Sequence, residues 1–354
     1  MNPYLTYPER AFWRRAVADV NMLEMKDLWR PKFTIPKDVE VVTAGSCFAQ
    51  HISRAMVSGG YKWLDAEPAP AFLPDDIKRK YGYGVFSFRT GNIYTTAALR
   101  QWVEAAFGEK RIPGEYWESE GRIYDPLRPA IEPGGFASVT EFEAHRRITL
   151  AAIRTALSEA GLFIFTLGLT ESWRNSHTDL VYAACPGTLA GEFSEEQHKF
   201  HNLAHSEILG DLQSTFDLIK KHNPNIKFLL TVSPVPLTAT ASGNHVLVST
   251  VFSKSVLRSV AGETSLARDD TEYFPSFEII SSFTFRGSFY MPNIREVSNA
   301  GVAHVMEHFF AGLGSGPMEP PRRRLADAPQ PLADAKPGPS DVICEEALLE
   351  AFAI

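Results

Sequence analysis

A short run near the N-terminus, residues 40–51, constrains the fold of this chain more than any other stretch. Its β-branched and small residues, EVVTAG, break at Gly45 and pass directly into a helical pattern. This order predicts a strand, a tight turn and a helix, because glycine lets the backbone bend sharply. Ser46 would then lie at the carboxyl end of a strand and at a helix N-terminus, where unpaired N–H groups favour negative charge. That position suits either a nucleophile or a helix N-cap.

Later segments repeat the alternation of strands and helices. Continuous apolar runs at residues 162–167 and 226–232 predict buried parallel strands, and a helical stripe between them predicts a right-handed crossover. We expect further helices near residues 95–107, 141–160, 245–260 and 298–310, and a further strand at residues 277–280. The pattern predicts a three-layer α/β/α domain over residues 1–313, with a doubly wound, mainly parallel sheet of about five strands.

The C-terminal part of the chain has a different composition. Residues 314–340 are rich in proline, alanine and charge, and we expect them to form a disordered linker. Residues 341–354 carry apolar side chains at helical spacing. They predict a short amphipathic helix that docks on the chain's own core or, as the alternative, binds a partner.

Charge and cysteine content narrow the class of protein. The net charge of −7 offers no general attraction for nucleic acid, and no stretch is apolar for long enough to predict a membrane span. Three scattered cysteines predict neither a disulfide framework nor a zinc site, and we expect no cofactor. The N-terminus lacks the pattern of a secretory signal, so we expect a cytoplasmic location.

The five residues from Gly45 to Ala49 spell the motif GSCFA, and the chain resembles the family of that name. Residues 163–171, 230–236 and 273–279 resemble the other blocks of the family in the same order. The family looks like a distant branch of the SGNH/GDSL hydrolases. This resemblance implies an SGNH-like fold and an acyl-transfer or ester-hydrolysis reaction, in which Ser46 is the nucleophile.

The remaining site residues are expected around that serine. Ser46, Gly168 to Glu171 and Ser233 all follow the ends of predicted parallel strands, so they should converge on one crevice. The resemblance assigns oxyanion or substrate binding to Gly91 and Asn92, and to Gly168 and Thr170. A threonine stands at position 170 where SGNH enzymes carry asparagine, and its hydroxyl can still donate one hydrogen bond.

The general base is the incomplete part of the pattern. SGNH enzymes carry Asp-x-x-His before their last helix, and residues 293–296 contain neither residue. We consider His245, His51 and His201, and we favour His245 because its loop belongs to the carboxyl edge of the sheet. Glu171 or Glu278 could orient the imidazole.

Cys47 offers a different nucleophile beside Ser46, but a cysteine at this place is more often a small buried residue.

Two functions fit these residues. The first is a serine esterase or O-acyltransferase acting on an acylated polar substrate, with carbohydrate preferred because Trp117, Trp173 and Tyr182 lie in the loops expected to face the crevice. The second is a catalytically degenerate relative that binds a small molecule or glycan without reaction. An imidazole within hydrogen-bond reach of the Ser46 hydroxyl would favour the first.

Overall fold

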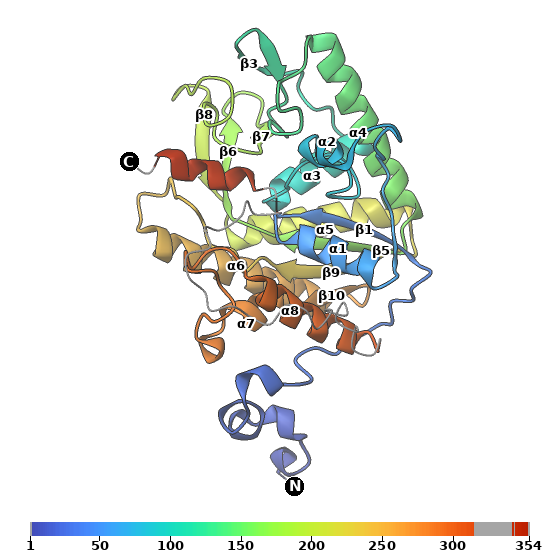
Figure 1. Cartoon of the computed structure of the whole chain (residues 1–354), viewed down its shortest axis with the longest axis vertical. Helices are drawn as coiled ribbons and strands as arrows, with labels where there is room; N and C mark the ends of the chain where they lie inside the picture. The colour runs from blue at the N-terminus through green and yellow to red at the C-terminus, as the bar shows by residue number, and fades with distance from the viewer. Residues whose placement is uncertain (1, 315–341, 343, 353–354) are drawn as a thin grey trace, which may run out of the picture.

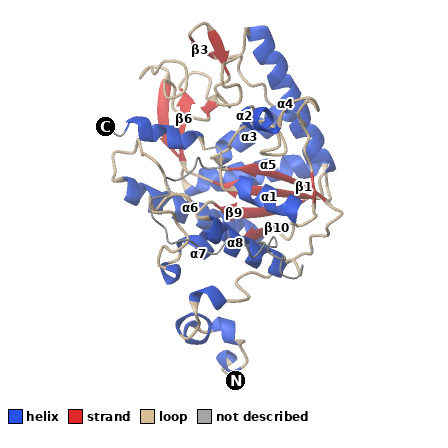
Figure 2. Cartoon of the chain, viewed as in Figure 1, coloured by secondary structure: helices blue, strands red, loops and turns tan. Residues whose placement is uncertain are grey.

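The computed structural model describes residues 2–314, 342 and 344–352. Its centre is a five-stranded sheet in the order β10-β9-β5-β1-β2, and every neighbouring pair is parallel. The strands, shown red in Figure 2, are β1 (Glu40–Gly45), β2 (Lys62–Trp63), β5 (Leu162–Leu167), β9 (Lys227–Val232) and β10 (Thr271–Phe274). The predicted α/β class and the mainly parallel sheet of about five strands are therefore confirmed.

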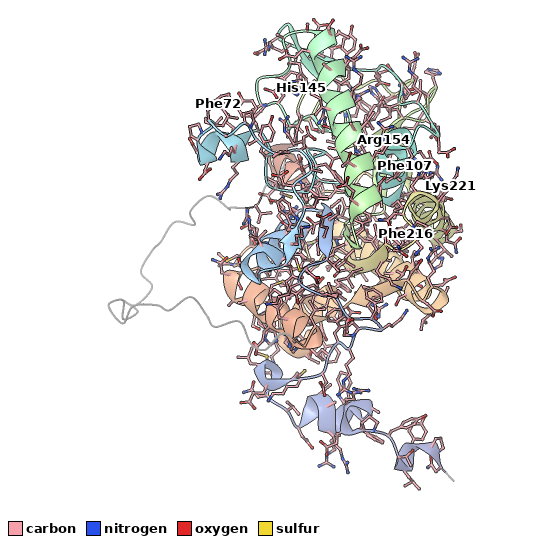
Figure 3. All side chains as sticks on the ribbon, turned by 90° about the vertical axis from the view of Figure 1, so that its right-hand side faces the viewer. Phe72, Phe107, His145, Arg154, Phe216 and Lys221 are labelled. Atoms are coloured by element: carbon pink, nitrogen blue, oxygen red, sulfur yellow. The ribbon has the colours of Figure 1, made fainter. Side chains whose placement is uncertain are left out.

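Helices cover both faces of this sheet (Figure 1). One face packs against α3 (Thr96–Ala106), α4 (Val139–Glu159), α5 (His205–His222) and α6 (Val246–Ala267). The other face packs against α1 (Ala49–Ser58), α7 (Ser276–Ser281) and α8 (Asn299–Gly312). Alternate residues of β1, β5, β9 and β10 enter the two apolar cores, because successive strand side chains point to opposite faces. Phe216 of α5, labelled in Figure 3, stacks on Phe228 of β9 with ring centroids 3.9 Å apart.

Smaller elements surround this core. A three-stranded antiparallel sheet lies beyond the carboxyl end of β5, and a short hairpin lies beside it (Figure 1). The three-stranded sheet consists of β6 (Glu171–Asn175), β7 (Val181–Tyr182) and β8 (His198–Asn202), and the hairpin of β3 (Trp117–Ser119) and β4 (Arg122–Tyr124). A short helix, α2 (Asp75–Lys80), precedes α3 in the chain. Short helices at Pro3–Leu5, Glu9–Ala11, Arg14–Ala18 and Met22–Glu24 extend from one end of the domain, and a single turn, Phe283–Phe285, follows α7.

The strand predicted at residues 277–280 is wrong, since the structure has helix α7 at Ser276–Ser281 and places the edge strand earlier, at Thr271–Phe274. Pro275 separates the two elements and has no N–H to donate to a ladder. The side chains of Ile279 and Ile280 fill the core beside α8. A short apolar run has the same composition in a buried helix as in a strand, so the pattern alone could not distinguish them.

Only part of the predicted C-terminal region lies within the described residues. Apart from Gly314, the linker predicted at residues 314–340 lies outside the described residues. Within residues 341–354, Glu345–Phe352 forms a 3-10 helix that lies over the carboxyl side of the sheet, next to β6 and α6 (Figure 1). None of the described helices is long and apolar enough to cross a membrane.

The order of the strands fixes where a ligand could bind. From β1 the chain passes to β2 on one side, and it later returns to β5 on the other side of β1. Ligands of open α/β sheets bind beyond the carboxyl ends of the strands at such a reversal. Ser46 directly follows β1 at this point.

Candidate functional site

Gly45 sets the backbone that carries Ser46. Its φ is +133°, and a Cβ at this position would lie 2.4 Å from the carbonyl oxygen of Thr166 on β5. The next N–H, that of Ser46, donates to the same Thr166 oxygen at 3.0 Å. No side chain fits here, because the conformation and the close approach both require glycine.

The Ser46 side chain is buried but makes no hydrogen bond that would stabilise the fold among the described residues. It is 2% exposed, and its Oγ has no hydrogen-bond partner among the described residues. Helix α1 begins at Ala49, and the residue at its N-cap position is Phe48, so Ser46 Oγ does not cap the helix. A buried hydroxyl without a partner costs free energy, which makes this position a candidate for a functional role.

The loop at residues 91–94 and the end of β5 pack directly against this turn. Ile93 N–H donates to Gly45 O at 2.8 Å, and the N–H groups of Gly168 and Leu169 both donate to Tyr94 O, at 3.1 and 2.9 Å. A Cβ on Gly168 would lie 3.0 Å from Ser46 Cβ. The structure therefore brings these predicted residues together, but the Gly168 N–H already has an acceptor and is not free for an oxyanion.

Thr170 and Ser233 differ in what their hydroxyls do. Thr170 is fully buried, and its Oγ1 has no partner among the described residues. Its N–H donates to Ser253 Oγ of α6 at 3.0 Å. Ser233 Oγ instead accepts the N–H of Val235 at 3.3 Å, which is a turn contact within its own loop. Of the two hydroxyls, only that of Thr170 is without a hydrogen-bond partner among the described residues.

Glu171 organises a loop and does not orient a histidine in the structure. Its Oε1 accepts from Thr240 Oγ1 at 2.5 Å, and its Oε2 accepts from Ala241 N–H at 3.3 Å. Partial burial raises the pKa of this carboxyl. The other carboxylate considered, Glu278, pairs with Arg258 and accepts from Tyr273 Oη at 2.7 Å.

The three candidate histidines occupy different places. His245 is exposed at the N-cap of α6, where its Nδ1 accepts the N–H of Leu247 at 3.1 Å. His201 pairs with Glu207 at 2.8 Å. His51 is half-buried on α1 beside the Phe48 ring, and burial lowers its pKa to about 4. Ser46 Oγ has no hydrogen bond to any of the three.

A buried lysine that sequence reasoning missed contacts Gly168, the residue that packs against Ser46. Lys254 of α6 is 2% exposed, and its Nζ donates to Gly168 O at 2.7 Å. Burial lowers the pKa of Lys254 to about 8. The sequence did hold a signal, because Lys254 and Leu257 fall at helical spacing on the buried face of α6.

Cys47 is a buried thiol in contact with the C-terminal end of the chain. Its thiol interacts with that of Cys344, and this contact together with burial raises the pKa of Cys47 well above its ordinary value. A thiol in such surroundings is a poor nucleophile.

The segment that follows Cys344, named here the C-terminal segment (Glu345–Phe352), lies against these residues. Glu345 Oε2 accepts hydrogen bonds from Tyr94 Oη, at 3.1 Å, and from Asn92 Nδ2. Glu346 accepts the N–H of Thr238 at 2.9 Å and lies 3.4 Å from Arg295 Nη2. Burial raises the pKa of both carboxyls, that of Glu346 to about 7.

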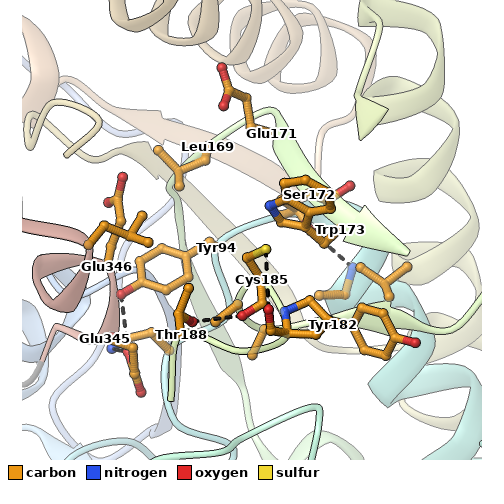
Figure 4. Close-up of a pocket in the computed structure, with 18 of the residues that line it drawn as sticks. Tyr94, Leu169, Glu171, Ser172, Trp173, Tyr182, Cys185, Thr188, Glu345 and Glu346 are labelled. Atoms are coloured by element: carbon orange, nitrogen blue, oxygen red, sulfur yellow. Dashed lines mark hydrogen bonds between the residues drawn. The ribbon is translucent and has the colours of Figure 1, made fainter. Parts of the chain in front are cut away.

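A cavity of about 430 Å³ adjoins this arrangement (Figure 4). Trp173 and Tyr182, both expected to face a crevice, line it together with Tyr94, Glu345 and Glu346. Trp117 does not line the cavity; it is buried, with its ring centroid 5.5 Å from that of Tyr182. Ser46, Gly168, Thr170 and Lys254 are also absent from the lining while the C-terminal segment is docked.

Within residues 2–314, 342 and 344–352, no three His, Cys, Asp or Glu side chains gather closely enough to hold an ion.

The comparison with known families covers the whole of this site except its C-terminal segment. A comparison with curated proteins finds no match to this chain. The GSCFA family matches residues 40–309, which is most of the sequence and includes every strand of the central sheet. The chain therefore belongs to the GSCFA family.

Proposed function

We propose that the chain is an SGNH-like serine esterase or O-acyltransferase that acts on an acylated polar substrate, with carbohydrate preferred. The observation that carries the proposal is Ser46 itself. Its hydroxyl lies just beyond the carboxyl end of β1, where the strand order reverses, and it has no partner among the described residues. A hydroxyl kept unpaired at a ligand-binding edge is free to attack a carbonyl carbon.

Lys254 is our candidate for the base that activates Ser46. Its Nζ and the Ser46 side chain both lie against Gly168, and serine–lysine pairs perform acyl transfer on other folds. With its pKa lowered to about 8, about a tenth of the amine is neutral at pH 7 and about half at pH 8. The neutral amine takes the hydroxyl proton as Ser46 Oγ bonds to the ester carbonyl carbon, and it returns that proton to the departing alkoxide. His245, the base predicted from the sequence, is the alternative.

Of the residues to which the resemblance assigns oxyanion or substrate binding, Thr170 and Asn92 are our candidates, because the Gly168 N–H already donates to Tyr94 O. Thr170 Oγ1 has a hydrogen to donate and no acceptor among the described residues. Asn92 Nδ2 donates to a carboxyl oxygen of Glu345, so this amide already faces an oxygen acceptor. Both groups fit the stabilisation of negative charge that develops on a carbonyl oxygen.

The cavity supports a polar organic substrate. Trp173 and Tyr182 supply apolar faces, and Gln101 and Glu171 supply polar groups in the same lining. Sugars bind to such combinations of aromatic faces and hydrogen-bonding groups.

A second candidate function is ligand binding without reaction. It is favoured by one observation: among the described residues no imidazole makes a hydrogen bond to Ser46 Oγ. The cavity would then serve recognition alone.

Labelling with a fluorophosphonate probe tests the proposal. We expect the probe to modify the peptide that contains Ser46 and to lose this modification in Ser46→Ala. Ser233→Ala is the matched control, because Ser233 is also a buried serine after a strand, and its hydroxyl serves only its own turn. If a folded Glu345→Ala/Glu346→Ala variant, which lacks the carboxyl oxygens that dock the C-terminal segment, also stays unlabelled at Ser46, ligand binding without reaction becomes the better proposal.

A further inference from the structure

Two carboxyl groups from outside the family match, those of Glu345 and Glu346, dock on donors of the family domain. Glu345 and Glu346 follow residue 309, where the family match ends, whereas the side chains of Asn92, Tyr94 and Arg295 and the N–H of Thr238, which contact them, lie within residues 40–309. These contacts therefore join the family domain to a separate piece of the chain.

The first carboxyl subsite surrounds Glu345. Tyr94 Oη and Asn92 Nδ2 both donate to its Oε2, and Figure 4 shows the Tyr94 hydroxyl pointing at this residue. A Cβ on Gly91 would lie 3.1 Å from Glu345 Oε1. Gly91 has a φ of +67°, so the lack of a side chain both permits the turn and leaves room for the oxygen.

The second subsite surrounds Glu346. It combines the Thr238 N–H with two positive groups, Arg295 at 3.4 Å and the more remote Lys254. Arg295 Nε is buried and has no partner among the described residues. A guanidinium and a backbone N–H are donors that recognise carboxylates.

Apolar contacts complete the docking of the segment. Leu349 and Phe352 line the cavity, although Phe352 remains 61% exposed. Burial raises the pKa of both glutamates, so the desolvation of their charge offsets part of what the donors contribute. A segment held by this balance can exchange with a ligand of similar chemistry.

We propose that Asn92, Tyr94, Thr238 N–H and Arg295 form a binding site for a carboxyl-bearing small molecule, and that the C-terminal segment occupies this site in cis through Glu345 and Glu346. The ligand competes with the segment for the same donors. This inference goes beyond the proposed function, because a carboxyl ligand and a docked segment require no catalysis. Where both hold, the substrate is an acylated molecule that also carries a carboxyl group.

Alkylation of Cys344 reports on the docked segment in the full-length chain. Its Sγ lies 3.7 Å from Tyr94 Oη and 3.9 Å from Arg295 Nη2, so docking shields the thiol. We expect Glu345→Ala/Glu346→Ala, which removes the acceptor oxygens, to speed the reaction of Cys344 with iodoacetamide at least tenfold, measured by peptide mass spectrometry. Glu350→Ala is the matched control, because Glu350 is exposed on the same 3-10 helix, and it should leave the rate unchanged.

The wild-type chain tests the ligand class without any substitution. We expect D-glucuronate to speed Cys344 alkylation saturably, by at least fivefold, at constant ionic strength. D-glucose, which has the same ring without the carboxyl, should have no effect. Arg295→Gln should weaken the response to glucuronate.

Each contrary result overturns a stated part of the proposal. An unchanged alkylation rate in the folded double alanine variant means that the carboxyls do not hold the segment. A wild-type chain that ignores glucuronate, or responds equally to glucose, rules out the carboxyl ligand class. Neither readout uses enzymatic turnover, so a failure of the esterase proposal leaves these outcomes interpretable.

Discussion

Tyr94 donates a hydrogen bond from its Oη to Glu345 Oε2 over 3.1 Å, although 251 positions separate the two residues in the chain. Two residues from Tyr94, Asn92 donates to the same carboxyl. The loop that packs against the Ser46 turn therefore also holds the C-terminal segment.

Gly45→Ala should destabilise the domain by more than about 3 kcal/mol, because it adds a strained φ to a collision with the β5 backbone. The predicted Cβ position lies 2.4 Å from Thr166 O. Gly60→Ala is the control: Gly60 also has a positive φ, but no atom lies within 4 Å of its added Cβ. We expect this control to cost about 1 kcal/mol in urea unfolding. An equal decrease in the free energy of unfolding in the two variants would show that the close approach of Gly45 to β5 does not contribute to the destabilisation.

Thr170→Val should lower activity while leaving the stability of the fold nearly unchanged. The Thr170 hydroxyl is buried without a partner among the described residues, so replacing it with a methyl group should change the free energy of unfolding by less than about 1 kcal/mol. If the hydroxyl binds the oxyanion, kcat/KM on an aryl acetate falls by the equivalent of roughly 1–3 kcal/mol.

Thr215→Val is the matched control for this substitution. Thr215 on α5 also carries a buried hydroxyl with no partner in the described chain, but it lies in no part of the proposed site. We expect the same small change in stability and an unaltered rate. A rate loss in both variants would mean that Thr170 acts through packing alone.

Lys254→Met should lower kcat/KM on an aryl acetate by about 10²–10⁴-fold, the usual contribution of a general base. The wild-type rate should rise with pH through an apparent pKa of about 8, because only the neutral amine can accept the Ser46 proton. Lys254→Arg keeps the charge but cannot act as a base in this range, and it should be equally impaired. Circular dichroism would verify that both variants fold.

His245→Ala decides between the two candidate bases. His245 is exposed, and its Nδ1 caps α6, so we expect activity within about twofold of wild type. If His245→Ala abolishes turnover while Lys254→Met retains it, the base predicted from the sequence is correct. In either case Ser46→Ala should remove activity, and the double variant with the true base should lose no more than Ser46→Ala alone.

Docking of the C-terminal segment should weaken as the pH rises toward neutrality. The docked Glu346 carboxyl faces Arg295, Lys254 and Cys344, and burial raises its pKa from 4.5 to about 7. The docked segment therefore binds a proton more tightly than the released one, so docking is strongest below about pH 4.5 and weakens as the pH rises to about 7. Above about pH 7 the Glu346 carboxyl is ionised in both the docked and the released segment, so it adds no further pH dependence to docking.

The ratio of Cys344 alkylation rates in wild type and Glu346→Gln checks this dependence, because the intrinsic pH effect on the thiol cancels. We expect the ratio to rise between about pH 5 and 7 and then to level off. A ratio that stays flat over this range would show that Glu346 titrates alike in the docked and released segment.

The sequence by itself determined the frame of this protein. Apolar runs identified β1, β5 and β9 within a residue or two, since a central parallel strand must be apolar on both faces. Gly45 followed by Ser46 identified the turn, because only glycine satisfies its backbone. The short run after Pro275 was misread as a strand, because period and composition do not separate a buried strand from one buried helical turn.

Only the tertiary structure decided which side chains meet at the site. Lys254 comes to Gly168 from 86 positions away, and Glu345 comes to Asn92 from 253 positions away. Packing of α6 on the sheet and docking of the C-terminal segment produce these contacts, and no local pattern encodes them. For the same reason the chain-order argument for His245 identified the correct edge of the sheet but could not tell that its side chain points to solvent. The sequence identifies turns and buried strands locally, whereas contacts between residues far apart in the chain depend on how the layers pack.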